Sequence, residues 1–582
     1  MDLDFRKNAK LSVENCILID EIADRYRQSF SSFIDGLSQD NITKIDWWIS
    51  ALPGKNTYAT DLFENFCRII LVEELLRKGK VIEHVFVDSF FLEKIIKEVF
   101  KNYNKKIAII TSSKPLIKAI YYPLRRYFRF LFLAIFRFLV CRIFYPAKIC
   151  KIKKVILIDT FILKDSFSSG EFKDRYYGEF EKYLSESEKK TFFFIPTILT
   201  SSLVPSISVE ETLETIKKLR LSSKQFLLDE DFLKLEDYFY SFLFPFRFFR
   251  FFPKKFIFGG IDFSPLLKKV WWENLFSDNS IVGLLKYSFA RKLKESGFEV
   301  TAVIDWHENQ SLDRGLDAGF RKFFPSAKVI GYQGYIISRY FLGQIPSEME
   351  VKAKVVPKSI SVIGKHLLER KKDFPRGVEL VVSPALRFPY IHEKVCKNAH
   401  ETFTIFVPLS YQERSAFTVL DYLFIAKDFF TSRNKDLKLI IKAHPYGFYG
   451  NKFISFMELT GLNQIFLVTK DPVSEIFRNV DLVIADESNV CCEALANSLP
   501  VIIVGNSTGL TFNPIPSSIP GKFWKLVRSP DEMINSINFF YSLLGQEKQV
   551  FEEELSRLKN GFYEPVSQQN VRKFFGFGNP VS

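Results

Sequence analysis

The sequence lacks the cysteine patterns that build disulfide frameworks or cysteine-based zinc sites. Its seven cysteines are scattered, odd in number and form no CxxC pair. Cys491 and Cys492 are adjacent in a stretch with helical spacing, where small residues of this kind face a core. This usage favours a reducing compartment and argues against a zinc site.

Apolar runs long enough to cross a bilayer are also missing. The longest run in the most apolar region is Phe130–Phe136, whereas a spanning helix needs roughly 20 residues. The amino terminus, MDLDFRKNAK, is charged and no hydrophobic segment follows it, so we expect no secretory signal. RRM, KH and helix-turn-helix signatures are absent as well, which disfavours nucleic acid as a partner.

Phenylalanine and positive charge are abundant instead. The chain has 64 Phe residues and a net charge of +14, a balance suited to anionic lipid or phosphorylated substrates. Two regions, 121–154 and 242–258, mix aromatic and basic residues. In the first, arginines at helical spacing share one arc, as in a helix that lies on an anionic membrane surface. The alternative is a buried aromatic helix whose arginines reach out to solvent.

Short β-branched segments alternate with helical patterns along most of the chain. This rhythm predicts an α/β fold with parallel sheets and right-handed crossovers. We expect a boundary near 395–401, with an N-terminal Rossmann-like domain over 1–395 and a C-terminal one over 396–545. The N-terminal domain would carry a basic aromatic insertion at 115–154 and a helical one at 200–290. The tail, 546–582, would pack back on the N-terminal domain.

Three loops of the C-terminal domain follow predicted strands and therefore meet at one edge of its sheet. The polar residues that they bring there are Arg414, Lys442, His444, Asp486, Ser488 and Asn489, with Glu493 on the helix that follows. Cations and the N–H groups of a helix capped by Ser488 can hold a phosphate, and a carboxylate can accept from ribose hydroxyls. Taken singly, each of these residues could be a solvated or structural residue and not a ligand-binding one. Together they predict a nucleotide pocket.

These motifs resemble those of known families. The segment 481–502, DLVIADESNVCCEALANSLPVI, resembles a pattern of bacterial polymer transferases with the GT-B fold, which include CDP-glycerol glycerophosphotransferases and capsule and sialic-acid transferases. IIKAHP (440–445) resembles their HP motif. DWHENQSLDRGL (305–316), VIGYQGY (329–335) and SPALR (383–387) resemble a bacterial surface-carbohydrate biosynthesis family. The resemblance covers about 300–580, and Asn489 stands where a second serine is usual.

The resemblance implies two Rossmann-type domains that face a cleft, with the nucleotide on the C-terminal side and the acceptor on the N-terminal side. Lys442 and His444 would lie near the donor phosphate, Ser488 would bind it, and Glu493 would contact ribose or sugar. Because Asn489 has an amide where the families have a hydroxyl, the resemblance supports phosphate binding less strongly for Asn489 than for Ser488.

The catalytic base would come from the N-terminal domain. A carboxylate there can take the proton of the acceptor hydroxyl, and Glu308 is our choice, with His307 and Asp305 as alternatives. Glu308 could instead complement the dipole of the following helix. Arg314, about two turns along that helix, could steady phosphate or Glu308.

The implied activity is transfer of a sugar from a nucleotide-activated donor to a lipid-linked or oligosaccharide acceptor in capsule or O-antigen biosynthesis. No DxD pair stands at a strand end, since Asp229–Asp231 lies in a charged helical stretch. We therefore expect no metal and no cofactor, and an inverting displacement at the cytoplasmic face of the membrane. Alternatives are a CDP-glycerol-type transferase, an epimerase of the same fold, or a non-enzymatic basic protein that binds membrane or nucleic acid.

Overall fold

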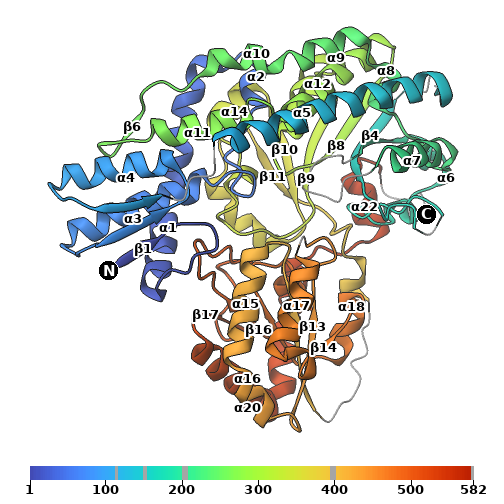
Figure 1. The fold of residues 1–582 in the computed structure, drawn as a ribbon. Helices are drawn as coiled ribbons and strands as arrows, with labels where there is room; N and C mark the ends of the chain where they lie inside the picture. Colours follow the sequence, from blue (N-terminus) through green and yellow to red (C-terminus); the bar gives the residue numbers. More distant parts are fainter. Residues whose placement is uncertain are drawn as a thin grey trace.

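Two lobes make up the molecule (Figure 1). The computed structural model describes the chain except for residues 112–115, 148–153, 169, 199–207, 394–401, 448 and 579–582, and the side chains of 116–120. The expected domain boundary near 395–401 lies outside the described residues. The upper lobe in Figure 1 contains the segments before this gap and the last helix, α22, and the lower lobe contains the second large sheet, which follows the gap.

The upper lobe is built on a six-stranded sheet in the order β11-β10-β9-β8-β4-β5, with all strands parallel. Two of its long strands, β4 and the edge strand β5, are buried on both faces, which explains their nearly continuous Val, Ile and Phe sequence. Its strands are β4 (Val155–Ile162), β5 (Phe192–Ile198), β8 (Val300–Trp306), β9 (Lys328–Gln333), β10 (Ser359–Val362) and β11 (Glu379–Val382).

The lower lobe has a second six-stranded parallel sheet, in the order β14-β13-β12-β15-β16-β17. The two facing parallel sheets confirm the predicted α/β, GT-B-like fold class. Short apolar runs in the sequence at 403–408, 438–443, 465–468, 481–485 and 500–505 predict every strand of this sheet but the last, β17. The strands are β12 (Phe403–Pro408), β13 (Leu437–Lys442), β14 (Leu467–Val468), β15 (Leu482–Ala485), β16 (Val501–Val504) and β17 (Trp524–Val527).

The first 111 residues add a separate three-stranded parallel sheet to the upper lobe. It is formed by β1 (Asp2–Asp4), β2 (His84–Val87) and β3 (Ala108–Thr111) in that order. Its helices share one hydrophobic core with the helices that cover the large sheet. Those of this segment are α1 (Val13–Ser38), α2 (Ile45–Trp48), α3 (Leu62–Arg77) and α4 (Phe90–Asn102).

The remaining helices cover the two large sheets. In the upper lobe, α12 and α13 pack so closely that a Cβ at Gly315 would lie 2.0 Å from the Gly283 carbonyl oxygen. This contact fixes α13, which follows the end of β8. The upper helices are α6 (Glu186–Lys189), α7 (Val209–Leu221), α8 (Asp229–Phe232), α9 (Leu235–Phe242), α10 (Phe244–Phe248), α11 (Ser264–Asn274), α12 (Asp278–Glu295), α13 (Ser311–Phe323) and α14 (Glu348–Ala353). The lower helices are α15 (Glu413–Ile425), α16 (Lys427–Ser432), α17 (Gly450–Thr460), α18 (Val473–Ile476) and α19 (Val490–Ala496).

One predicted strand is wrong. Besides the runs that form β10 and β11, the sequence predicts a strand at Val355, but this residue lies in an irregular segment just after α14. Lys354 ends that helix in a left-handed conformation, with φ of 60°, and turns the chain away. Val355 is buried there by packing and not by strand pairing.

The basic aromatic segment forms α5 (Leu116–Leu139) and a π-helical turn, Val140–Phe144. One face of α5 packs on the upper lobe through Tyr127 and Phe130, while Phe128 and Phe132 on the other face are about 60% exposed. The packed face agrees with the interpretation of a buried aromatic helix, and the membrane interpretation stays a prediction for the exposed face. None of the helices in the described part of the chain is long and apolar enough to span a bilayer.

The chain returns to the upper lobe after the second sheet. Helix α20 (Pro530–Ser556) is kinked at Glu547 and leads to α21 (Lys559–Phe562) and α22 (Gln568–Phe574). Figure 1 shows α22, in red, among the elements of the upper lobe. There Phe575 packs on Phe180, at 4.8 Å between ring centroids, and on Phe192, at 4.9 Å.

Candidate functional site

A cavity of about 1190 Å³ lies between the lobes. Both sheets direct the loops at the carboxyl ends of their strands toward it, as open parallel sheets do at ligand sites. Six of the residues proposed from sequence line it, and five others, Asp305, His307, Arg314, Arg414 and Asp486, do not. The lining residues are Glu308, Lys442, His444, Ser488, Asn489 and Glu493.

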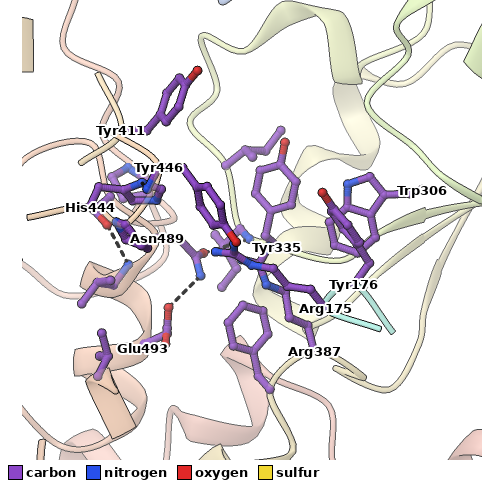
Figure 2. Close-up of a pocket in the computed structure, with 18 of the residues that line it drawn as sticks. Arg175, Tyr176, Trp306, Tyr335, Arg387, Tyr411, His444, Tyr446, Asn489 and Glu493 are labelled. Carbon is purple, nitrogen blue, oxygen red and sulfur yellow. Dashed lines mark hydrogen bonds between the residues drawn. The ribbon is translucent and has the colours of Figure 1, made fainter. Parts of the chain in front are cut away.

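Glu308 follows the end of β8 and presents its carboxylate to the cavity. The carboxylate accepts hydrogen bonds from Trp306 Nε1 (3.1 Å), Tyr335 Oη (3.0 Å) and Gln310 Nε2. The start of α13 is capped by another residue, since Asp313 accepts from the backbone N–H groups of Glu308 and Gln310. Three donors thus hold the Glu308 carboxylate in one orientation at the wall of the cavity. Figure 2 shows two of the residues that donate to it, Trp306 and Tyr335.

The two alternative bases lie behind Glu308. Asp305 and His307 are fully buried, and their side chains bond to each other, with 3.1 Å between Asp305 Oδ2 and His307 Nδ1. Burial, helped by the charge of Glu308, raises the pKa of Asp305 to about 8. The structure therefore brings only Glu308, of the three candidates, to the cavity.

Arg314 is also buried and turned away from the cavity. Its guanidinium donates to the carbonyl oxygens of Ser50 (3.1 Å) and Gln310 (3.3 Å). A Cβ at Gly54 would lie 2.4 Å from Arg314 Nη2, so the loop after α2 closes over this group. Arg314 ties α13 to that loop.

His444 and Lys442 reach the cavity from the end of β13. Tyr446 N–H donates to His444 Nδ1 at 3.2 Å, which leaves Nε2–H of the neutral ring as a donor. Burial, together with the charges of Arg175, Arg387 and Lys442, lowers the pKa of His444 to about 4. Lys442 Nζ donates to the carbonyl oxygens of Lys470 (2.9 Å) and Asp471.

The loop after β15 supplies Ser488, Asn489 and Glu493. Ser488 Oγ accepts from Val490 N–H at 3.3 Å, but α19 begins after Asn489, so the prediction that Ser488 caps this helix is wrong. Asn489 donates to Glu493 at 3.2 Å and accepts from the backbone N–H of Ile336, in the upper lobe, at 3.0 Å. Glu493 also accepts from Tyr390 Oη. Asn489 and Glu493 therefore join the two lobes at the floor of the cavity, where Figure 2 shows them together.

The two remaining sequence candidates support the site from outside. Arg414 forms an ion pair with Glu64 of α3, at 2.8 Å, so it joins the lobes. Asp486 is buried and accepts from Ser410 Oγ at 2.7 Å. Burial and the charge of Glu487 raise the pKa of Asp486 to about 8.

Sequence reasoning missed two arginines of the cavity, Arg175 and Arg387. Arg175 lies over the ring of Tyr446, 4.6 Å from its centroid, and Arg387 lies 5.5 Å from the centroid of Phe388. Neither forms an ion pair with a carboxylate of a described residue. Arg387 belongs to the SPALR motif, which was a usable signal, whereas nothing in the sequence around Arg175 marks it. Figure 2 shows both arginines between the walls of the cavity.

Searches of protein-family models and of curated proteins find no match to this chain. Similar solved structures include a putative UDP-N-acetylglucosamine 2-epimerase from Listeria monocytogenes, with 11% identity and a TM-score of 0.42, over 74% of this chain and 98% of that one. A glycosyltransferase from Rickettsia africae has 11% identity and a TM-score of 0.40, over 73% and 97% of the two chains.

Anabaena HepE, solved in complex with UDP, has 10% identity and a TM-score of 0.40, over 73% of this chain and 98% of that one. At such low identities and TM-scores these likenesses carry no argument about the chemistry of the cavity. That chemistry rests on the residues described above.

Proposed function

We propose that the protein is a glycosyltransferase that moves a sugar from a nucleotide-activated donor to an acceptor hydroxyl. The observation that carries the proposal is one cavity that holds both a positioned carboxylate, Glu308, and a group of cations and neutral donors. Arg175, Arg387 and His444 belong to that group. A nucleotide sugar needs the cations for its diphosphate, and an acceptor hydroxyl needs the carboxylate.

The donor diphosphate would bind where the two arginines meet the loop of His444. Guanidinium groups pair with phosphate oxygens in a bidentate fashion, and the Nε2–H of a neutral His444 adds a donor. Lys442, Ser488 and Glu493 remain proposed contacts of phosphate, ribose or sugar. The cavity volume of about 1190 Å³ exceeds the ~300–1,000 Å³ of ordinary ligand pockets, which leaves room for donor and acceptor together.

The transfer step follows from this placement. Glu308 takes the proton of the acceptor hydroxyl as its oxygen bonds to the anomeric carbon, while the bond from that carbon to the diphosphate oxygen breaks. The electron pair leaves with the nucleoside diphosphate, whose developing charge the arginines and His444 stabilise. Because the acceptor attacks opposite the leaving group, the product is inverted. This step uses no metal.

The acceptor is proposed to be lipid-linked, at the cytoplasmic face of a membrane, in surface polysaccharide (capsule or O-antigen) synthesis. Exposed aromatic and basic side chains support this: Phe132 on α5 and Phe246 on α10 are 62% and 74% exposed. The two segments lie side by side, since Tyr127 Oη of α5 donates to the Phe242 carbonyl. Such a surface is suited to an anionic membrane interface.

Vesicle binding tests the membrane part. The triple variant Phe128→Ser, Phe132→Ser and Phe246→Ser should lose binding to anionic-lipid vesicles. A matched control, Phe424→Ser with Phe539→Ser, changes exposed aromatic residues of the lower lobe and should keep it. Equal binding by both variants would contradict the proposed surface.

Ligand screening tests the transferase. Thermal unfolding of the full chain would be followed with UDP, GDP, CMP and CDP compounds, and at least one should raise the melting temperature. If none does, the nucleotide-binding proposal fails. Product analysis with the donor that binds then separates glycosyl transfer from polyol-phosphate transfer and from epimerisation, which needs no acceptor.

A further inference from the structure

A second cluster of reactive side chains lies behind Glu308, outside the cavity. Asp305 and His307, at the end of β8, face Asp317 of α13. All three are at most 1% exposed. One ligand atom from each lies within 4.8 Å of the others, with 3.1 Å from His307 Nδ1 to Asp305 Oδ2 and 4.0 Å to Asp317 Oδ2. The three groups therefore converge on one point.

The cluster has more buried carboxyl oxygens than hydrogen-bond partners for them. Both oxygens of Asp317 and Oδ1 of Asp305 are buried without any hydrogen-bond partner among the described residues. Both oxygens of Asp159, on neighbouring β4, are in the same state. A buried carboxylate left unpaired costs several kcal/mol, so such groups are normally paired, protonated or bound to a metal.

The cations around the cluster are already engaged. Lys286 forms an ion pair with Asp229, at 3.1 Å. Arg314 donates to the carbonyl oxygens of Ser50 and Gln310, and Arg321 donates to that of Val356. The neighbouring carboxylate of Asp313 is engaged as well, since it accepts from backbone N–H groups at the start of α13. None of these side chains reaches the free oxygens of Asp317 by a hydrogen bond.

We propose that Asp305, His307 and Asp317 bind a divalent metal ion of the zinc class. An imidazole with two carboxylates suits zinc, whereas magnesium and calcium prefer oxygen ligands alone. Metal–ligand bonds of about 2.0–2.1 Å in a tetrahedron place the ligand atoms about 3.3 Å apart. The observed 3.1 Å and 4.0 Å bracket that value. The site uses no cysteine, so cysteine spacing gave no sign of it.

The metal would act on structure and not on the transfer step, since none of its three ligands lines the cavity. It would fasten the end of β8 to α13 on both sides of the loop that carries Glu308. The proposal does not depend on what the cavity binds.

Metal analysis of the full chain tests the proposal. Purified protein should contain about one equivalent of zinc by mass spectrometry, and chelation should lower the melting temperature until zinc is added back. The cluster could be stabilised by a bound metal or by protons on its carboxylates. Asp317→Asn separates these two states, because asparagine has the shape of a protonated aspartic acid but binds zinc poorly. If the cluster binds zinc, the variant loses both the metal and the zinc-dependent melting shift. If the cluster holds only protons, the variant melts as the unchanged protein does.

A matched control uses the other group of possible ligands in the described part of the chain, the exposed Asp2, Glu83 and His84. His84→Ala should leave the zinc content unchanged, and loss of zinc there would overturn the assignment. Should Asp317→Asn fail to fold, cobalt added to the chelated, unsubstituted protein replaces it as the test. Visible absorption of a four-coordinate site is expected, and its absence, with no zinc bound, overturns the proposal.

Discussion

The two walls of the cavity use their polar side chains differently. On the lower wall, the motif residues Asn489 and Glu493 bond across to the upper lobe, and behind that wall Arg414 is paired with Glu64. On the upper wall, Arg175 and Arg387 have no carboxylate partner among the described residues. The recognisable motif thus holds the lobes together as much as it faces a ligand. Two of the cavity's cations, Arg175 and Arg387, come from the wall where the sequence predicts the acceptor, and Lys442 comes from the other wall.

The largest expected effect separates the catalytic group from the binding groups. Glu308→Gln should lower the transfer rate about 10²–10⁴-fold while nucleotide affinity stays within a factor of about three, because the amide cannot take a proton. Kinetics with calorimetric binding would measure both. Glu179→Gln is the control, since Glu179 also lines the cavity but pairs with Lys182 on the surface. An unchanged transfer rate in Glu308→Gln would show that Glu308 is not the catalytic base.

The upper-wall arginines come next. Arg387→Ala should weaken binding of a nucleoside diphosphate about 10–100-fold, the value of a charge-assisted contact of roughly 1.5–3 kcal/mol. Binding of the matching nucleoside should change little, since it carries no phosphate. Arg376→Ala, an exposed arginine outside the cavity, serves as the control. Unchanged diphosphate affinity would mean that only residues of the lower wall bind the phosphates.

Arg414 tests the structural role, in which an arginine joins the two lobes and does not bind phosphate. Arg414→Ala should destabilise the protein by about 1 kcal/mol, because Glu64 loses one of two partners and keeps Arg68 at 2.7 Å. Denaturant unfolding measures this, and nucleotide affinity should stay nearly constant. A large loss of affinity at unchanged stability would show that Arg414 binds phosphate, as the sequence predicts.

His444 gives the smallest effect, in the pH dependence of stability. The unfolded chain binds the proton near pH 6.5 and the folded chain only near pH 4, so the unfolded state holds more protons between these values. Lowering the pH from 7 to 5 should therefore cost about 1 kcal/mol at this site after allowance for solvent screening. His444→Gln should remove that part of the acid sensitivity in unfolding curves. An identical pH dependence in both proteins would contradict a neutral, buried His444.

The sequence predicted the sheets well and the site in part. Strand positions followed from β-branched runs, and β12 and α13 have the predicted bounds, because local hydrophobic periodicity decides them. Glu308 and His444 lie on loops directly after strands, so topology alone placed them at the cavity. Arg175 could not be found this way. Its position depends on how an irregular segment folds over the cavity, which no local pattern encodes.

Partner choice was also beyond the sequence. A lone arginine in a loop looks the same whether it faces a ligand or an acidic side chain some 350 positions away, as Arg414 does. Similarly, the DWHENQ stretch shows two acids and a histidine at close spacing, but only the fold reveals that Glu308 faces the cavity while its neighbours face Asp317.

The return of the C-terminal segment to the upper lobe has a consequence for biosynthesis. Phe575, which follows the lower lobe in the sequence, fills the core around Phe180 and Phe192, so the upper lobe lacks part of its interior until the chain has been made as far as Phe575. The lower lobe is made in between. The two lobes therefore cannot finish folding one after the other as they leave the ribosome, and a change in the segment around Phe575 would act on the upper lobe, far from it in sequence.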